Sequence, residues 1–268
     1  TDLEATMEAH LLCSVLLDNS ASPLLKALET TELGSSPSPL CGLDDSQREL
    51  CFVCGIEGSE PDRADALQAL VLSVLEGVAE NGVPAEQLAA SLHQLELQQR
   101  EIGGGNFPYG LQLLLTALTS ATHRGDPIAL LNLDPVLEKL RRLIRDPDYI
   151  KQLARRLLLD NPHRVRLTMS PDRELSARRE KEEADKLAAI KADLDDAGKQ
   201  AIVEQAEILN QRQQQKDDDA ILPKVGLDDI PAHMDYVAAT ERKTRPLTLT
   251  SYGTGTNGLV YQQILLPL

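Results

Sequence analysis

Two charged, helix-forming runs follow one another in residues 172–216 and meet at residues 195–198, Asp-Asp-Ala-Gly. Aliphatic residues recur at helical spacing on one face of each run, namely Leu175, Leu187, Ile190 and Leu194 in the first and Ile202, Ile208 and Leu209 in the second. Pro171 precedes the runs and Pro223 follows them, and proline lacks the backbone donor that a helix interior needs. The sequence therefore predicts a long helical hairpin with its tip at residues 195–198.

The chain before this hairpin has the pattern of one domain. Periodic apolar residues bounded by Pro, Gly and Asn predict helices at 3–17, 24–33, 63–80, 84–100, 110–122, 135–145 and 147–159. Residues 49–57 and 164–169 have strand patterns, and residues 35–45, rich in Ser, Pro and Gly, predict an exposed loop. We therefore expect an α+β fold, a helix-rich α/β sandwich with a mainly antiparallel sheet.

The chain after the hairpin is a short β-like tail. Residues 247–249 and 259–266 favour strands, and the glycine-rich residues 253–258 predict a turn between them. Because a lone two-stranded hairpin is marginally stable in water, we expect this tail to belong to something larger.

The composition limits both the core and the partners. Leu and Ala dominate the apolar residues, with no Trp and only two Phe, so the core must be aliphatic and largely helical. The net charge of -15 argues against a surface that binds phosphates, and no apolar run approaches the roughly 18 residues of a membrane span. We therefore expect neither nucleic acid nor a membrane as a partner.

The four cysteines are too few for a disulfide scaffold of this length, which favours reduced thiols in a cytosol-like compartment. Cys51 and Cys54 have the spacing of zinc ligands or of a redox pair. They lie in a strand-like run, where residues three apart point to opposite faces, and no second pair follows. Buried strand cysteines are the favoured interpretation, and a metal or redox pair is the alternative.

Short motifs occur in order along nearly the whole chain: residues 16–24 (LLDNSASPL), 92–96 (LHQLE), 161–163 (NPH), 171–172 (PD), 222–223 (LP), 229–231 (DIP) and 256–258 (TNG). This set resembles the presequence-protease branch of the pitrilysin and insulin-degrading-enzyme superfamily. Such enzymes are zinc metallopeptidases with four related α/β domains in two bowl-like halves, which a long helical hairpin joins. They enclose a chamber and degrade unfolded peptides.

The resemblance implies a division into three parts. Residues 1–171 would be the second, noncatalytic peptidase-like domain without its first strands, and residues 172–216 the helical hairpin linker. Residues 217–268 would be a linker and the first strands of the third domain.

The catalytic motif of this superfamily, H-x-x-E-H, is absent from the 268 residues. In that motif two His bind zinc one helical turn apart, and the Glu between them activates water. The nearest approach is His93-Gln-Leu-Glu96, where Leu97 stands in place of the second His. We therefore assign His93 and Glu96 structural roles, predict no catalytic or metal-binding residue here, and expect zinc only in an intact parent enzyme.

The resemblance also implies an exosite for peptides. In insulin-degrading relatives the amino-terminal segment of a substrate docks in the second domain, on a turn between two helices and an adjacent strand. The matching positions are residues 18–23 and 49–54, and the candidate substrate-binding residues are Asp18, Asn19, Ser20, Ser22, Glu49, Leu50 and Phe52. A strand with a free edge offers backbone donors and acceptors to an extended peptide. In the alternative, Ser22 only starts a helix and the strand lies inside a sheet.

Two functions from different classes follow. The first is a noncatalytic fragment of a zinc metalloendopeptidase that supplies chamber wall, peptide exosite and hinge, with the remaining domains and unfolded peptides as partners. We expect it in a bacterial-type cytoplasm, or alternatively in an organelle matrix. The second is a non-enzymatic helical adaptor whose hairpin docks a partner helix, although its irregular apolar spacing argues against a long autonomous zipper.

Overall fold

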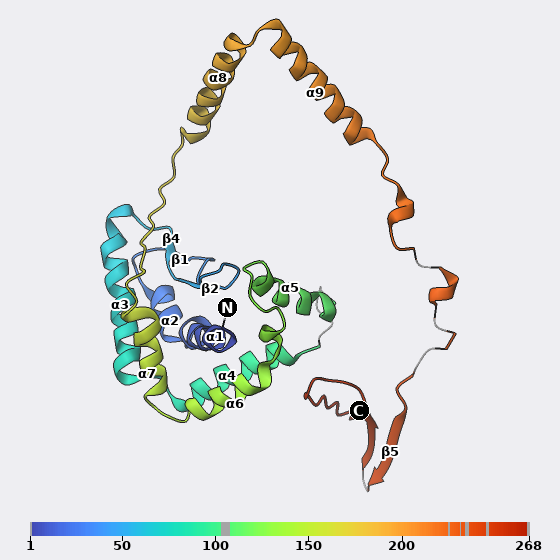
Figure 1. Ribbon diagram of the computed structural model, residues 1–268. Coiled ribbons are helices and arrows are strands. Elements are labelled where there is room, and N and C mark those ends of the chain that lie inside the picture. Colours follow the sequence, from blue (N-terminus) through green and yellow to red (C-terminus); the bar gives the residue numbers. More distant parts are fainter. Residues whose placement is uncertain are drawn as a thin grey trace. The chain divides into compact units, whose positions relative to one another are not determined.

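The computed structural model describes residues 2–266 apart from 103–107, 225, 231, 234, 235, 245 and 246. The chain divides into two compact units. Unit 1 contains the residues up to Met169 together with those from Thr254 onward, and unit 2 is Ser170–Gly253. The chain therefore leaves unit 1 after Met169 and returns to it at Thr254 (Figure 1).

Helix α1 (Leu3–Leu17) is the centre of unit 1. Asp2 caps it by accepting a hydrogen bond from the Glu4 N–H at 3.0 Å. Four helices pack directly on α1, and Figure 1 shows them around it: α2 (Pro23–Thr30), α4 (Ala85–Arg100), α6 (Leu133–Leu143) and α7 (Tyr149–Ala154). Their shared core is aliphatic, as the composition predicts, and its fully buried side chains include Leu11, Leu12, Val15, Leu16, Leu24, Leu28, Leu137, Leu140, Ile150 and Leu153.

The other helices of unit 1 are more peripheral. Helix α3 (Ala64–Asn81) packs on α2 and α7 and ends where Gly82 adopts a φ of 72°, a conformation that glycine tolerates. Helix α5 (Tyr109–Ala121) packs on the 3-10 helix Ala129–Leu131 (η2), and α7 continues as the π-helix Arg155–Leu159 (η3). A further 3-10 turn, Pro61–Arg63 (η1), precedes α3. The helices predicted from proline and glycine positions are thus confirmed to within a few residues at their ends.

The sheets of unit 1 are small. Strand β1 (Ser36–Pro37) pairs antiparallel with β4 (Ile56–Glu57), and β2 (Gly42–Asp44) pairs antiparallel with β3 (Cys51–Val53), placing Leu43 opposite Phe52. The predicted strand at 49–57 is therefore two short strands, and the predicted loop at 35–45 supplies a partner for each. The α+β class is confirmed, with antiparallel pairing in both sheets.

The predicted strand at residues 164–169 is wrong in this structure, since the segment lies outside any helix or strand. Its arginines bind neighbouring elements: the Arg164 guanidinium donates to the carbonyls of Leu158 and Leu159 at 3.1 and 2.9 Å, and Arg166 pairs with Asp65 of α3. The alternating apolar residues Val165, Leu167 and Met169 are all exposed. Among the described residues no strand lies beside them, and a strand needs a hydrogen-bonded neighbour to form.

Unit 2 contains the two charged helices, α8 (Leu175–Asp193) and α9 (Asp196–Gln214). The predicted tip is too long, because Asp195 is the N-cap of α9 and accepts a hydrogen bond from the Gly198 N–H at 2.7 Å. Residues 196–198 therefore form the first turn of α9. Neither helix has a buried residue.

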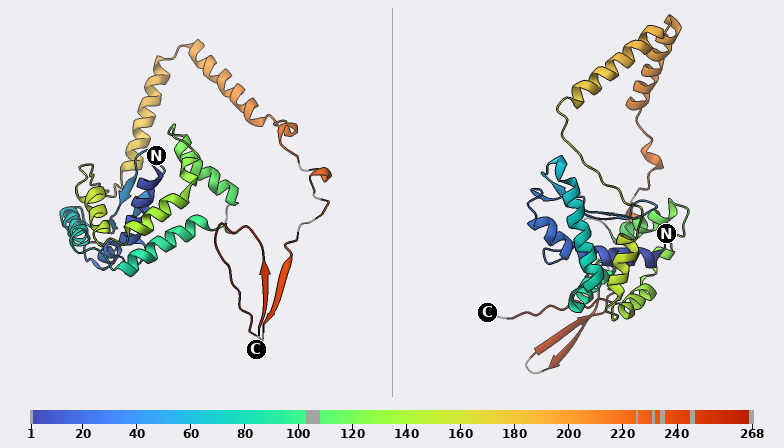
Figure 2. Two further views of the ribbon diagram at one scale, coloured as in Figure 1. Left: turned by 60° about the horizontal axis from the view of Figure 1, so that its bottom comes forward. Right: turned by 90° about the vertical axis from the view of Figure 1, so that its left-hand side faces the viewer.

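The described residues in the rest of unit 2 form two 3-10 turns, Asp219–Ile221 (η4) and Leu227–Asp229 (η5), and one β-hairpin. Strands β5 (Ala239–Thr244) and β6 (Leu247–Tyr252) run side by side in antiparallel register, as Figure 2 shows. The predicted strand at 247–249 is present within β6, but its partner is β5. The expected partner at 259–266 lies outside any strand.

No single helix among the residues described here is long and apolar enough to cross a bilayer. Pro61–Asn81 and Ala85–Arg100 pass a test of length and apolarity only as a pair, with a bend of 107° between them.

Candidate functional site

The turn between α1 and α2 is stabilised by its own polar groups. The Asn19 Oδ1 accepts a hydrogen bond from the Ala21 N–H at 3.0 Å, and the Asn19 carbonyl accepts one from the Ser22 N–H at 2.7 Å. The Ser22 side chain is 1% exposed and its hydroxyl accepts from the Asn19 N–H at 3.4 Å. Asp18, Asn19 and Ser20, by contrast, are exposed. Ser22 therefore supports the turn from inside, and the outer surface belongs to the three residues before it.

The second predicted element, residues 49–54, contains β3. Because β3 belongs to a two-stranded sheet, β2 occupies one of its edges and no described strand occupies the other. Glu49 is exposed, and the side chains of Leu50 and Phe52 are half-buried, Phe52 against the core. The backbone of this segment is thus free to pair with another extended chain on one side.

Helix α1 connects the turn to this hairpin. Its His10 Nε2 lies 3.1 Å from the Asp45 Oδ2, directly after β2, and its Cys13 thiol is hydrogen-bonded to the Leu43 backbone within β2. Asp18 follows the end of the same helix, roughly 7.5 Å along the axis from Cys13 at 1.5 Å per residue. The structure therefore supports both predicted elements on one helix.

Sequence reasoning missed His10, Cys13 and Asp45, because the strand they hold in place, β2, lies in a segment that the pattern assigned to a loop. The signal available was Gly42-Leu43-Asp44, which is too short to show the alternation of a strand.

The thiols near this site are unreactive. Burial raises the pKa of Cys13 to about 11, with Asp18 and Cys41 adding to the rise against the hydrogen bond from Leu43. Burial and the nearby Cys41 likewise raise the pKa of Cys54 to about 11. Such thiols are protonated near neutral pH, and the thiolate is the nucleophile and metal ligand.

Cys51 differs from Cys54, its neighbour in the C-x-x-C spacing. It is exposed on β3, so the prediction of two buried strand cysteines is wrong for this residue. Cys54 is half-buried after the strand ends, and all four cysteines are free thiols.

The His93–Glu96 stretch on α4 does not fit a zinc ion. The Glu96 carboxylate is ion-paired with Arg100, at 2.7 Å, and with Arg141. Burial raises the pKa of Glu96, but the hydrogen bonds from Arg141 and Arg100 outweigh it and hold the pKa below its usual range. Both oxygens are thus committed to guanidinium groups. Within the described ranges, no set of three or more His, Cys, Asp or Glu side chains is arranged to hold a metal.

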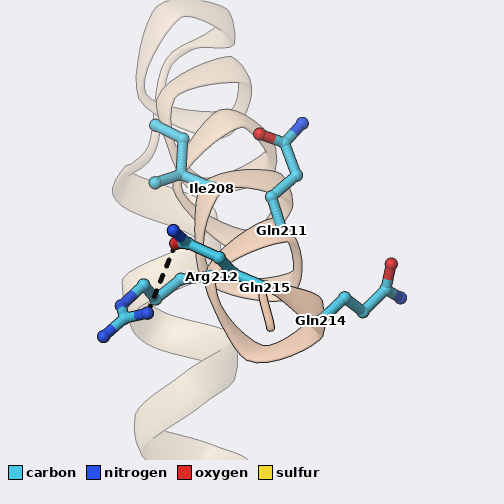
Figure 3. A pocket seen from close by; sticks show the side chains of 5 residues that line it. All are labelled: Ile208, Gln211, Arg212, Gln214 and Gln215. Atoms are coloured by element: carbon cyan, nitrogen blue, oxygen red, sulfur yellow. Dashed lines mark hydrogen bonds between the residues drawn. The ribbon is translucent and has the colours of Figure 1, made fainter. Parts of the chain in front are cut away.

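A hollow at the end of α9 is lined by Ile208, Gln211, Arg212, Gln214 and Gln215 (Figure 3). These side chains are exposed, and the one hydrogen bond drawn joins the Arg212 guanidinium to the Gln215 Oε1 at 3.3 Å. The polar groups do not converge on a common point, so this hollow lacks the features of a built site.

Comparison with known proteins connects this arrangement to one group of peptidases. The family model for the region associated with subfamily C of the pitrilysin-type peptidases matches residues 169–268. The mitochondrial presequence protease of Xenopus tropicalis is 27% identical over 262 residues, which is 97% of this chain and 25% of that protein. Presequence protease 1 of Arabidopsis thaliana, chloroplastic and mitochondrial, is 27% identical over 270 residues, or 98% of this chain and 25% of that protein.

A bacterial relative shows the same extent of similarity. Protein HypA of Clostridium perfringens is 26% identical over 264 residues, which is 97% of this chain and 27% of that protein. The chain spans about a quarter of the length of the curated relatives it matches. The resemblance carried by the sequence motifs is thereby confirmed, and the chain belongs to the presequence-protease type of the pitrilysin family.

Proposed function

We propose that this chain is a noncatalytic part of a zinc metalloendopeptidase that degrades unfolded peptides in an enclosed chamber. The observation that carries the proposal is the similarity to presequence proteases along 97% of the chain. The catalytic H-x-x-E-H motif is absent from these 268 residues, and the nearest substitute, Glu96, is bound to two arginines. Zinc and the water it activates are therefore supplied by another part of the polypeptide.

In this proposal each part of the chain has a mechanical role. Residues 1–171 contribute chamber wall as the second peptidase-like domain. Residues 172–216 form the hinge between the two halves of the enzyme, and residues 217–268 lead into the third domain. Two features support the hinge: α8 and α9 have no buried residue, and the break between them is only Leu194 and Asp195. Helices that bury nothing can move without disrupting a core.

We further propose that β3 and the adjoining turn anchor the far end of a long peptide. The free edge of β3 would pair with an extended peptide through backbone hydrogen bonds, which accept many sequences. Glu49, Leu50 and Phe52 line this edge, and Ser22 holds the turn in shape beneath Asp18, Asn19 and Ser20. Asp18 would attract the free amine of a peptide, although an exposed ion pair contributes only about 0 to 1 kcal/mol.

The structure refines the test of this exosite. A proline at Phe52 would disturb the pairing with Leu43 inside the β2–β3 ladder, whereas Leu50 lies just before the strand. In the full-length enzyme, Leu50→Pro should raise the KM for long peptides several-fold more than for short ones, because only long peptides reach from the zinc to β3. Lys224→Pro is the control, since Lys224 is exposed in a coil of unit 2. Equal effects of Leu50→Pro on both lengths, with the fold intact, would remove the exosite.

The second candidate function is a helical adaptor. It is favoured by the exposed aliphatic side chains of α8 and α9, including Leu187 at 57% and Ile208 at 66% exposure. Zinc content and peptidase activity of the full-length protein discriminate between the two. Bound zinc with activity supports the peptidase, while neither zinc nor activity leaves the adaptor.

The expected compartment follows from the thiols and the relatives. Free cysteines suit a reducing compartment. The animal and plant relatives above are named as mitochondrial or chloroplastic and one relative is bacterial, so we propose an organelle matrix or a bacterial cytoplasm for this chain.

A further inference from the structure

The carboxyl end of α4 binds a segment more than 150 residues further along the chain. The Asn257 side-chain amide donates a hydrogen bond to the Arg100 carbonyl at 3.2 Å, and the Arg100 guanidinium reaches the Asn257 carbonyl at 3.5 Å. The Tyr261 hydroxyl donates to the Glu101 carboxylate, also at 3.5 Å. All of these residues belong to unit 1. The last carbonyls of a helix have no partner within the helix, and here an asparagine supplies one.

The bound segment is a tight turn at residues 256–259. The Leu259 N–H donates to the Thr256 carbonyl at 3.0 Å, and the Thr256 hydroxyl donates back to the Leu259 carbonyl at 2.5 Å. Asn257 has a φ of 50° and Gly258 a φ of 84°, a backbone that Asn and Gly adopt more readily than other residues. Thr256 and Leu259 are half-buried. The turn therefore has its shape from local bonds before any contact with α4 is counted.

The receiving surface on α4 is an ion cluster. Arg100 is paired with Glu96 and Asp134, and Arg141 is paired with the other oxygen of Glu96. The Glu96 and Arg100 side chains are only 15% and 16% exposed. Because three partners fix the guanidinium of Arg100, its remaining donor and its backbone carbonyl have a defined position. A cavity of about 470 Å³ adjoins the cluster, and Gly258 and Leu259 form part of its wall.

We propose that the end of α4 is a docking site for the Asn-Gly turn, which anchors the returning chain to unit 1. Residues 170–253 leave unit 1 after Met169, and the turn lies just beyond their end. With the turn bound, this stretch is a loop fixed at both ends. With the turn released, it is held only at Met169 and gains conformational freedom. The anchor thus limits how far the hinge helices and the β5–β6 hairpin can travel from the first domain.

Hydrogen exchange of the full chain tests the anchor. Asn257→Ala removes the amide donor and disfavours the positive φ, while Asn257→Gly removes the donor alone. Amide exchange in residues 254–262 should rise roughly five-fold in Asn257→Gly, the effect of losing one hydrogen bond, and further in Asn257→Ala. Asn210→Ala is the matched control, because Asn210 lies exposed in α9 and its side chain binds only Gln214 in the interactions recorded.

A double substitution separates docking from a purely local turn. Arg100→Lys keeps a positive charge beside Glu96 but cannot reach three partners at once. If the turn docks on Arg100, the exchange increase in Asn257→Gly/Arg100→Lys is smaller than the product of the two single increases. Unchanged exchange in both Asn257 variants, or single effects that simply multiply, overturns the proposal. Retained protection of the α4 amides shows that each variant is folded.

Discussion

Helices α1 and α9 have similar lengths and opposite surroundings. Helix α1 is enclosed by four other helices, and its Leu11, Val15 and Leu16 are completely buried. Helix α9 buries nothing, and half or more of the surface of Ile202 and Ile208 is exposed. An isolated helix of this length is marginal in water, so tertiary packing stabilises the first helix and local interactions must stabilise the second.

The local interactions of α8 and α9 are visible in the structure. Asp195 caps α9, Gln200 donates to Glu204 at 3.2 Å one turn later, and Asp196 lies 3.4 Å from Lys199. Each such pair contributes a few tenths of a kcal/mol, whereas a buried leucine contributes several-fold more. The comparison therefore predicts that equivalent substitutions have very unequal effects in the two units.

Truncating a leucine gives the largest contrast. Leu11→Ala should lower the free energy of unfolding of unit 1 by about 2–5 kcal/mol, because it opens a cavity in a closed core. Leu187→Ala in α8 should change stability by no more than about 0.5 kcal/mol, since Leu187 is already 57% exposed and alanine favours a helix. Urea denaturation followed by circular dichroism measures both, and hydrogen exchange assigns each change to its unit. A large loss in Leu187→Ala would show that α8 is packed against a partner.

Alkaline pH gives a contrast of intermediate size. The Cys13 thiol has a pKa raised from 9.0 to about 11 by burial, so the unfolded chain loses this proton first. The contribution to stability is complete below about pH 9 and falls as the pH rises towards 11. Its size is a fraction of the roughly 1.4 kcal/mol that each pKa unit represents, because the thiol is partly solvated.

Cys13→Ala isolates this effect. The stability of unit 1 should fall less steeply between pH 9 and 11 in the variant, whatever its absolute stability, and the remaining slope belongs to groups such as Cys54 and Tyr149, whose pKa values burial also raises. Helices α8 and α9 contain no cysteine, and their exchange should be the same in both proteins. An identical pH slope with and without the Cys13 thiol would contradict the burial.

The same contrast explains which predictions from the sequence succeeded. Helix positions follow from local signals, and Gly82 and Pro84 mark the ends of α3 and α4 to within a residue. Strands depend on partners that a local pattern does not reveal. Residues 164–169 alternate well but lie unpaired, whereas Ser36–Pro37 and Gly42–Asp44 show no alternation and still pair.

The candidate site shows the same limit at the level of single residues. The turn after α1 was predictable, because Asp18-Asn19-Ser20 breaks a helix and Pro23 begins the next. The burial of Ser22 was not, since it depends on neighbours in the folded unit. The docking of Asn257 on Arg100 was equally hidden, because the Asn-Gly dipeptide predicts a turn but not what the turn touches.

The smallest predicted effect concerns the N-cap of α9. Asp195→Ala removes the acceptor of the Gly198 N–H, which should cost about 1 kcal/mol of helix stability. Because α9 shares no core with unit 1, this loss should remain local. Exchange in the first turn of α9 should rise several-fold, while the urea midpoint of unit 1 stays unchanged.

Asp195→Asn serves as the control for this last prediction, because asparagine caps about as well as aspartate but carries no charge. If capping is what matters, exchange in the first turn of α9 should stay close to that of the unmodified chain in Asp195→Asn and rise only in Asp195→Ala. Equal increases in both variants would mean that the charge of Asp195 near the helix N-terminus dominates, and that increase should shrink at high salt. A fall in the urea midpoint of unit 1 in either variant would show that the hinge helices are coupled to the core, and the contrast between the two units would then fail.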